Sequence, residues 1–568
     1  MKFKELSLYL EKLEKTPSRN TMTGILADLF KKSQAKEIDK IVYLLLGSLG
    51  PKYEGIVFDM ADKMILRAIA KAYDKDLSLV SNLYKNQGDL GNVAQELSKN
   101  TKNNFAVTEV FKRLLEITKD EGEGSQERKV KDLAYLFSNL DPLSCRFLAR
   151  IPVGRLRLGF SDKTILDALS WMIKGDKSVK SFLEKAYQVL PDPGLLAKKV
   201  KMEGLEKATR EVKPIVGVPV LPMLAQRLKS PKEMIEKMHK VAVEPKLDGL
   251  RLSIHFKKGK NLLIKAFTRN LNETSWMFPE LKTIKDSINA SEVILDSEAV
   301  GLEEETKQMA DFQTTMTRRR KHEIEKALSK IGIKFFIFDI LSKNGKNLMD
   351  LPYLERRKIL ERTFKESRNF KLVDYKITQK PEDIESIYKT KIGLGFEGVL
   401  VKKIDGSYIP GRTGWRWVKM KQEEKAKGKL ADTVDAVVMG YTRGKGKRTQ
   451  FGLGQFLVGV LGGEKIKTVT KIGTGLTDEQ FREMKTRLVK LEVKEKPLEY
   501  DIHKNYTPDV WVRPYLVVEI AADEISKSPT HSAGYALRFP RLVRFRDDKA
   551  PSEATTTLEI KKLFELQK

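Results

Sequence analysis

The hydrophobic pattern changes twice along the chain, and each change predicts a different kind of structure. Up to about residue 210, segments such as IDKIVYLLLGSLG and DKTILDALSWMIKG place apolar residues three to four positions apart, which is the period of amphipathic helices. From 211 to 422 apolar, β-branched runs alternate with helical segments, and from 423 to 568 short strands are separated by glycine-rich turns. We therefore predict a multidomain protein with an all-α domain at 1–210, an α+β domain at 211–422 and a small β-barrel at 423–568.

The third region follows a charged segment, KQEEKAKGKLAD (421–432), which has few apolar residues and is typical of a flexible hinge. The strands beyond it are short and closely spaced, with glycines in the turns between them. This spacing is typical of an OB-fold.

The segment VAVEPKLDGLRLSIHF (241–256) contains the candidate nucleophile, Lys246. The apolar residues on either side predict two strands joined by Asp248 and Gly249, a hairpin that would aim the amine into a pocket. With an ordinary pKa of about 10.4, a lysine is unprotonated in roughly one molecule in a few thousand at neutral pH. It therefore needs nearby positive charge or burial to react as a nucleophile.

A second K-x-D-G, at residues 403–406, is an internal control for the first. The first copy has Glu244 two positions before its lysine and Arg251 five positions after it. The second copy has Val401 and Tyr408 at the same offsets. A lysine-rich chain produces the tetrapeptide by chance, so the flanking residues are what distinguish the two copies.

Further strand-like segments end in polar residues, which is the pattern of strands that feed a pocket: FTRN (267–270), VILDSEAVG (293–301), FFIFDIL (335–341), GFEGVLVKK (395–403) and GWRWVKMK (414–421). They supply cations that could lower the pKa of a nucleophilic lysine and hold phosphates, namely Arg269, Lys402, Lys419 and Lys421. Glu298 and Glu397 offer hard oxygen ligands for Mg²⁺, and Phe338 could stack on a base, although core packing is the commoner fate of a phenylalanine. Any one segment alone is better explained by a strand edge with a solvent-facing charge.

Residues 393–398 (GLGFEG) match the pattern G-x-G-x-x-G, but the order of the neighbouring elements is wrong for a dinucleotide-binding turn. A helical segment, IESIYKTKIG, precedes the match, and a strand-like segment, VLVKK, follows it. The dinucleotide turn requires a strand before it and a helix after it, so we reject this interpretation.

The formal net charge of +29 over 568 residues favours a polyanionic partner, nucleic acid before a membrane surface. A lysine-rich surface of a protein from a hot habitat is an equally good explanation of the charge alone. In the helical region Arg150, Arg155 and Arg157 surround a glycine-containing loop. This composition suits phosphate binding, although a solvated basic loop would look the same.

The single cysteine, Cys145, excludes an intrachain disulfide, and five scattered histidines without a C-x-x-C give no zinc pattern. The N-terminal segment MKFKELSLYLEKLEK lacks the apolar core of a signal peptide, and no run approaches 18 apolar residues. We expect an intracellular, cytoplasmic protein without a membrane partner.

The segments EPKLDGLR, FTRN, ILDSEAV, FIFDIL, FEGVLVKK, WVKMK and LRFPRLVRFRDDK (537–549) resemble, in sequence and order, the nucleotidyltransferase motifs of ATP-dependent DNA ligases. The resemblance is strongest to the archaeal type, which is related to eukaryotic replicative ligase. It covers nearly the whole chain, because residues 146–169 also look like the helical DNA-binding domain of that family. The fold that it implies is an ATP-grasp-like adenylation domain between a helical domain and an OB-fold domain.

The resemblance implies that the protein seals nicks in duplex DNA during replication, repair and recombination. Lys246 would receive AMP from ATP, the AMP would pass to the 5′-phosphate of the nick, and the 3′-hydroxyl would displace it. Glu244 would read the adenine amino group and Phe338 would stack on the ring. The other implied roles are ribose or phosphate binding by Arg251 and Arg269, Mg²⁺ or Mn²⁺ binding by Glu298 and Glu397, α-phosphate binding by Lys419, Lys421 and Lys402, and pyrophosphate orientation by Arg546 and Lys549.

One position departs from the family pattern. The family usually has an arginine six residues before the first lysine of WVKMK, and Thr413 stands there with Arg412 beside it. We assign the phosphate contact to Arg412 by a one-residue shift. The resemblance also implies a monomer that associates with the nucleoid and binds a sliding clamp, although the chain has no glutamine-plus-two-aromatics peptide of the clamp-binding kind.

Two other classes of protein remain open at this point. An RNA ligase or a capping-type guanylyltransferase shares the lysine chemistry, but such enzymes do not usually carry a large helical domain before it. A DNA-binding protein without enzymatic activity would explain the charge, but it needs neither Lys246 nor the paired glutamates.

Overall fold

The computed structural model describes the chain except for residues 17, 100–104, 155, 157, 159, 211, 229, 304–330, 412–413, 422–432, 445–450 and 567–568. The chain divides into two compact units, Met1–Ala68 with Ser98–Gln422, and Ile69–Leu97 with Glu423–Lys568. The expected hinge at 421–432, apart from Lys421, lies outside the described residues, as do Arg155, Arg157, Arg412 and Thr413.

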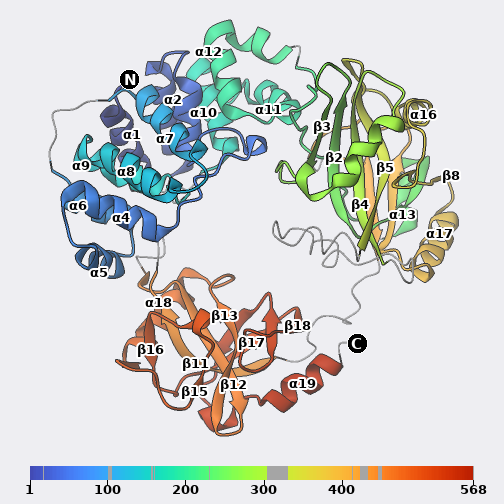
Figure 1. The fold of residues 1–568 in the computed structure, drawn as a ribbon. Helices are drawn as coiled ribbons and strands as arrows, with labels where there is room; N and C mark the ends of the chain where they lie inside the picture. Colours follow the sequence, from blue (N-terminus) through green and yellow to red (C-terminus); the bar gives the residue numbers. More distant parts are fainter. Residues whose placement is uncertain are drawn as a thin grey trace. The chain divides into compact units, whose positions relative to one another are not determined.

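The regular structure from Phe3 to Arg210 is helical wherever it is described, as the spacing of apolar residues predicts (Figure 1). The first helix shows the cause, because Phe3, Leu6, Leu10 and Leu13 lie on one buried face of it. The helices are α1 (Phe3–Lys15), α2 (Arg19–Lys32), α3 (Ile38–Leu45), α4 (Asp62–Tyr73), α5 (Leu77–Gln87), α6 (Leu90–Leu97), α7 (Val107–Lys119), α8 (Ser125–Ser138), α9 (Pro142–Arg150), α10 (Asp162–Lys174), α11 (Lys180–Val189) and α12 (Pro193–Arg210), with a 3₁₀ turn at Lys52–Glu54.

Two sheets, antiparallel except for the parallel pair of β5 with β7, form the centre of the α+β region. One has the strand order β10-β9-β1-β8, and the other has the order β3-β2-β4-β5-β6 with β7 beside β5. The strands are β1 (Val241–Lys246), β2 (Leu250–Lys257), β3 (Leu263–Thr268), β4 (Glu292–Glu303), β5 (Ile331–Lys343), β6 (Lys346–Asn347), β7 (Phe370–Leu372), β8 (Lys376–Thr378), β9 (Gly398–Lys403) and β10 (Trp417–Lys421). The helices are α13 (Pro231–Met238), α16 (Tyr353–Thr363) and α17 (Pro381–Gly393), with 3₁₀ turns at Ser275–Met277 and Pro279–Asp286.

The predicted hairpin around Lys246 is wrong in its pairing, although both strands exist. Strand β1 pairs with β8 and β9, whereas β2 pairs with β3 and β4. The chain therefore crosses from one sheet to the other through Leu247, Asp248 and Gly249. The sequence pattern shows where a strand lies, but long-range hydrogen bonds decide which strand is its neighbour.

The two sheets have separate apolar layers. Helices α13 and α17 cover the β1 sheet through Met234, Met238 and Ile384, which pack against Val241 and Val399. The second layer packs β2, β4 and β5 against the 3₁₀ turns and α16. Because α17 precedes β9, the order of elements at the GLGFEG match is helix then strand, which agrees with our rejection of a dinucleotide turn.

The C-terminal region is a curled, mostly antiparallel sheet with the order β14-β16-β11-β12-β13-β15, in which β17 pairs with both β11 and β20. Its elements are β11 (Val434–Thr442), β12 (Gln455–Gly462), β13 (Lys465–Ile472), α18 (Asp478–Val489), β14 (Glu492–Val493), β15 (Tyr500–Asp501), β16 (Val510–Val512), β17 (Val517–Ala521), β18 (Glu524–Lys527), β19 (Tyr535–Arg538), β20 (Arg541–Phe545) and α19 (Thr557–Glu565), with 3₁₀ turns at Lys504–Tyr506 and Pro551–Glu553.

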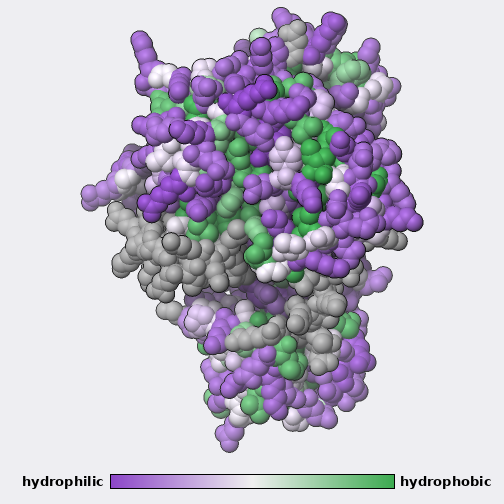
Figure 2. Space-filling view, turned by 90° about the vertical axis from the view of Figure 1, so that its right-hand side faces the viewer, coloured by the Kyte–Doolittle hydropathy of each residue, from purple (hydrophilic) through white to green (hydrophobic). Residues whose placement is uncertain are grey.

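Hydrophilic side chains cover most of the molecular face in Figure 2, as the charge of the chain requires. Among the residues that the structure describes, no helix has the length and apolar composition needed to cross a membrane.

Candidate active site

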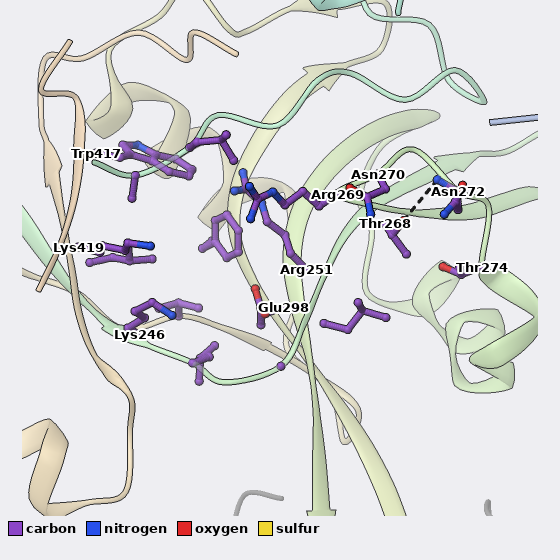
Figure 3. Close-up of a pocket in the computed structure, with 18 of the residues that line it drawn as sticks. Lys246, Arg251, Thr268, Arg269, Asn270, Asn272, Thr274, Glu298, Trp417 and Lys419 are labelled. Atoms are coloured by element: carbon purple, nitrogen blue, oxygen red, sulfur yellow. Dashed lines mark hydrogen bonds between the residues drawn. The ribbon is translucent and has the colours of Figure 1, made fainter. Parts of the chain in front are cut away.

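Lys246 lies at the edge of an open cavity of about 750 Å³ in the α+β region. It is the last residue of β1, and its side chain is 19% exposed. Lys419 of β10 reaches the cavity beside it, while Glu298 and Arg251 approach from the opposite wall (Figure 3). The crossing between sheets thus places the lysine where the strand ends of both sheets meet.

Glu397 is the direct partner of Lys246. Its carboxylate forms an ion pair with the Lys246 ammonium, and its backbone N–H donates to the Lys246 carbonyl at 3.0 Å. The antiparallel pairing of Lys246 with Gly398 holds the two residues together. The pairing of β1 with β9 therefore places two of the predicted site residues, Lys246 and Glu397, next to each other.

Glu298 stands opposite Arg251 in the pairing of β2 with β4. Burial raises the pKa of the Glu298 carboxyl to about 8, against the opposing charges of Arg251 and Lys246. A hard divalent cation beside this buried carboxyl would favour its charged form, and the carboxylate would then be a suitable ligand for the cation. In the described ranges no group of three or more His, Cys, Asp or Glu side chains is arranged so that it could hold a metal ion. Two carboxylates fit Mg²⁺, because this ion keeps several waters and shares its coordination with substrate phosphates.

Arg251 is held by protein groups to a degree that the sequence did not suggest. It donates from Nε and Nη2 to the two oxygens of Asp296, at 3.0 and 2.6 Å, and from Nη1 to the Met223 carbonyl at 2.7 Å. Tyr408 closes this network, because its hydroxyl donates to Asp296 at 2.9 Å. A guanidinium has five N–H donors, so few remain for a ligand.

Glu244 lines the cavity and is paired with Lys402. Glu244 is 1% exposed, Lys402 is fully buried, and their charged groups are 2.6 Å apart. The Lys402 ammonium lies 4.6 Å from the ring centre of Phe338 and 4.4 Å from that of Trp417. Phe338 is 6% exposed and lines the cavity, so it belongs both to the core and to the site.

The remaining predicted cations differ in how far the structure describes them. Arg269 is exposed in the loop after β3 and lines the cavity together with Lys419. Lys421 ends β10 and pairs through its backbone with Gly398, the residue that also pairs with Lys246. Arg412 lies outside the described residues.

Arg546 and Lys549 lie in the C-terminal region, where both are paired with one acid. Asp435 accepts from Arg546 Nη1 at 2.9 and 3.0 Å and from Lys549 Nζ at 2.7 Å. Asp548 accepts two further hydrogen bonds from Arg546, from Nε and from Nη2. The two cations predicted to orient pyrophosphate are therefore neutralised by this region's own carboxylates.

Arg150 does not reach an open surface. It is 5% exposed on α9, and its guanidinium pairs with Glu14 of α1 at 3.0 Å. This is the geometry of a structural ion pair between helices. Arg155 and Arg157 of the same loop lie outside the described residues.

Sequence reasoning missed several residues of the site. Trp417, Leu400 and Asp296 each lie within a recognised segment, but other residues of those segments were singled out. Tyr408 follows the second K-x-D-G and gave no signal. Their contributions depend on contacts between distant segments, which local patterns do not record.

A lysine that ends a strand in a cavity lined by cations and carboxylates defines the class of covalent nucleotidyltransferases. Three family models match the chain: "ATP dependent DNA ligase domain" at residues 222–421, "DNA ligase N terminus" at 2–170 and "ATP dependent DNA ligase C terminal region" at 449–549. A probable DNA ligase of Dictyoglomus thermophilum is 41% identical over 579 residues, which cover 100% of this chain and 98% of that protein. A DNA ligase of Saccharolobus solfataricus is 36% identical over 596 residues, with coverage of 100% and 98%.

The chain therefore belongs to the ATP-dependent DNA ligases, the family of nucleotidyltransferases that seals nicks in DNA. A solved structure titled "Pmar-Lig_PreS3" shares the fold, with a TM-score of 0.52 and 17% identity over 95% of this chain and 99% of that chain. The predicted family and enzyme class are confirmed. The predicted order of a helical region, a nucleotidyltransferase region and a β-rich region is confirmed as well.

Proposed function

We propose that Lys246 is the residue that carries the covalent AMP. The observation that supports this most strongly is the convergence of Lys246, Lys419 and Glu298 on one cavity (Figure 3). Lys246 attacks the α-phosphate of ATP in line with the leaving pyrophosphate, and Lys419 and Lys421 offset the charge that spreads over the phosphate oxygens. The ion pair with Glu397 holds the amine at the mouth of the cavity before ATP enters.

We propose further that the part of the cavity lined by Glu244 and Phe338 receives the adenine. Glu244 accepts from the amino group of the base, and Phe338 stacks against its ring. Arg269, exposed at the rim, holds the ribose or a phosphate, whereas Arg251 mainly supports Phe338, over whose ring centre it lies at 5.5 Å. Glu298 and Glu397 would hold Mg²⁺, which neutralises phosphate charge when bound.

The C-terminal region is proposed to be an OB-fold domain, because its sheet is curled and mostly antiparallel and packs against an apolar cluster to which α18 and α19 contribute. Arg546 and Lys549 bind the pyrophosphate of ATP during adenylation. They must then exchange Asp435 for phosphate oxygens. The boundaries that we propose for the three domains are 1–210, 211–422 and 423–568.

Incubation with α-labelled ATP and Mg²⁺, followed by peptide mapping, tests the first proposal directly. We expect one adenylate on the peptide that contains Lys246, and no label from GTP under the same conditions. An adenylate on another residue, or labelling by GTP alone, would contradict it. GTP labelling would favour a capping-type enzyme instead.

Nicked duplex DNA is the proposed partner of this basic chain, whose formal net charge is +29. If 6 to 10 phosphates are contacted, the affinity for a nicked duplex should fall by about 10³ to 10⁵ between 50 and 200 mM salt. Titration of fluorescent nicked DNA measures this dependence, and a flat salt response would exclude such a contact surface.

A further inference from the structure

Helix α16 delivers a tyrosine to the carboxylate of Glu244. Tyr353 is the first residue of this helix and is 1% exposed. Its hydroxyl donates a hydrogen bond to Oε1 of Glu244, and Lys402 lies 2.6 Å from Oε2 of the same carboxylate. One oxygen of Glu244 therefore accepts from Tyr353, and the other forms an ion pair with Lys402.

The position of Tyr353 is itself determined by two anchors of α16. The backbone N–H of Leu354 donates to the Ile404 carbonyl at 3.0 Å, and Arg356 Nη1 donates to the Gly406 carbonyl at 3.2 Å. Arg356 is fully buried and also pairs with Asp339, which directly follows Phe338. The start of the helix is thus connected both to the second K-x-D-G and to the strand that carries Phe338.

Tyr353 remains a donor under all ordinary conditions. Burial, together with the adjacent Glu244 charge, holds the pKa of the Tyr353 hydroxyl well above its usual value of 10.0. Lys402 lies 5.0 Å from the centre of the Tyr353 ring, so the same tyrosine also contacts the cation on the other side of Glu244. The three side chains form one buried unit behind the cavity.

We propose that Tyr353 is a positioning residue that determines the preference of the enzyme for adenine by fixing the orientation of the Glu244 carboxylate. An ionised carboxylate offers about four lone-pair positions. The hydrogen bond from Tyr353 occupies one of them, and the Lys402 ammonium is held by its charge beside the other oxygen. A remaining lone pair accepts from the 6-amino group of adenine. A base with an oxygen at that position places one acceptor against another and is refused, because the oxo group finds no donor on the carboxylate.

This inference depends on the proposed role of Glu244, and its test separates the two. Tyr353→Phe removes one hydroxyl and keeps the ring. Self-adenylation is measured without DNA in one mixture of labelled ATP and labelled ITP, which differ in the amino or oxo group at position 6. The ratio of the two products depends only on the folded molecules, so partial unfolding of the variant does not affect it.

We expect the preference for ATP over ITP to fall about tenfold in Tyr353→Phe, through a higher KM for ATP with kcat within about twofold of the wild type. Tyr375→Phe is the matched control, because Tyr375 packs edge-on against Tyr353 with ring centres 6.4 Å apart. This variant should leave the preference unchanged. A change of less than threefold in Tyr353→Phe, or an equal change in Tyr375→Phe, would overturn the inference.

A double-mutant cycle shows whether Tyr353 acts through Glu244. In a Glu244→Ala background, Tyr353→Phe should have no additional effect on the nucleotide preference. A persistent effect would mean that Tyr353 acts on the base in some other way. If the wild type forms no nucleotide adduct on Lys246, the proposed function fails, whereas adduct formation with an unaffected preference removes only the role of Tyr353.

Discussion

The two K-x-D-G turns of this chain have the same four-residue pattern and very different surroundings. Lys246 ends β1 and Lys403 ends β9, and these strands pair antiparallel, with Lys246 opposite Gly398 and Lys403 opposite Val241. The two turns therefore lie at opposite ends of one strand pair. At the first end the lysine borders the cavity and contacts Glu397, whereas at the second Lys403 lies 3.5 Å from Asp405, an acid that is largely exposed.

The second turn has a structural purpose that the first lacks. Its carbonyls at Ile404 and Gly406 accept hydrogen bonds from α16, which fixes the start of that helix. The first turn instead carries the chain between two sheets. The comparison shows that the tetrapeptide follows the end of a strand at both places, and that the elements around it decide whether its lysine lies at the cavity.

Replacement of each lysine by alanine should give the largest difference between the turns. Lys246→Ala removes the proposed nucleophile, and we expect self-adenylation to fall by on the order of 10⁴-fold or more. Lys403→Ala removes only a partly exposed ion pair, so adenylation should stay within about twofold of the wild type. Labelled ATP measures both variants. Adenylate label on the peptide that contains residue 403 would contradict the assignment of Lys246 as the adenylated lysine.

Arg356 connects the second turn to the buried structure, so replacement of Arg356 should destabilise the protein. In Arg356→Met the carboxylate of Asp339, which is 1% exposed, loses its partner. We expect the free energy of unfolding to fall by about 3–5 kcal/mol. Denaturant unfolding measures the change.

The double variant Arg356→Met with Asp339→Leu is the control for this prediction. It removes both charges and should recover much of the lost stability. A loss below about 1 kcal/mol in the single variant would show that the second turn is not anchored through Arg356.

Substitution of the glycine in each K-x-D-G, Gly249 and Gly406, should give a smaller difference, and again the first copy should be the more sensitive. A Cβ on Gly249 would lie 2.4 Å from the carbonyl oxygen of Ala299, which is backbone and unable to yield. On Gly406 the nearest atoms would be 3.2 Å away or farther. We expect Gly249→Ala to cost about 1–3 kcal/mol and to slow adenylation, and Gly406→Ala to cost less than about 1 kcal/mol. Thermal unfolding and adenylation rates measure both variants. A greater loss of stability in Gly406→Ala than in Gly249→Ala would contradict the prediction.

The smallest expected effect concerns the acid that faces Lys246 across the cavity. Burial raises the pKa of Glu298 from 4.5 to about 8, so the folded protein keeps a proton that the unfolded chain releases. The stability from this group is complete below pH 4.5 and is lost as the pH rises through about 8. In metal-free protein, Glu298→Gln should therefore gain about 1–2 kcal/mol relative to the wild type between pH 5 and 8.

Denaturant unfolding at a series of pH values measures this gain. Addition of Mg²⁺ should diminish it, because a bound cation favours the charged form of Glu298 in the wild type. A difference between the two proteins that does not change with pH would contradict the raised pKa.

The sequence by itself determined where most helices and strands lie and to which family the chain belongs. The spacing of apolar residues identified the helices before residue 210 and the strands around Lys246, because a side chain's burial repeats with the period of its own helix or strand. The order of seven short segments identified the family. The helix before GLGFEG and the strand after it were sufficient to reject a dinucleotide site.

Only the tertiary structure decided which segments meet. It corrected the hairpin at Lys246 into a crossing between two sheets, placed Arg150 in a buried ion pair with Glu14, and brought Tyr353 to Glu244. These contacts join residues far apart in the sequence, and Arg150 and Glu14 alone are separated by 136 positions. Local periodicity carries no record of such distances, because they depend on how whole sheets and helices pack.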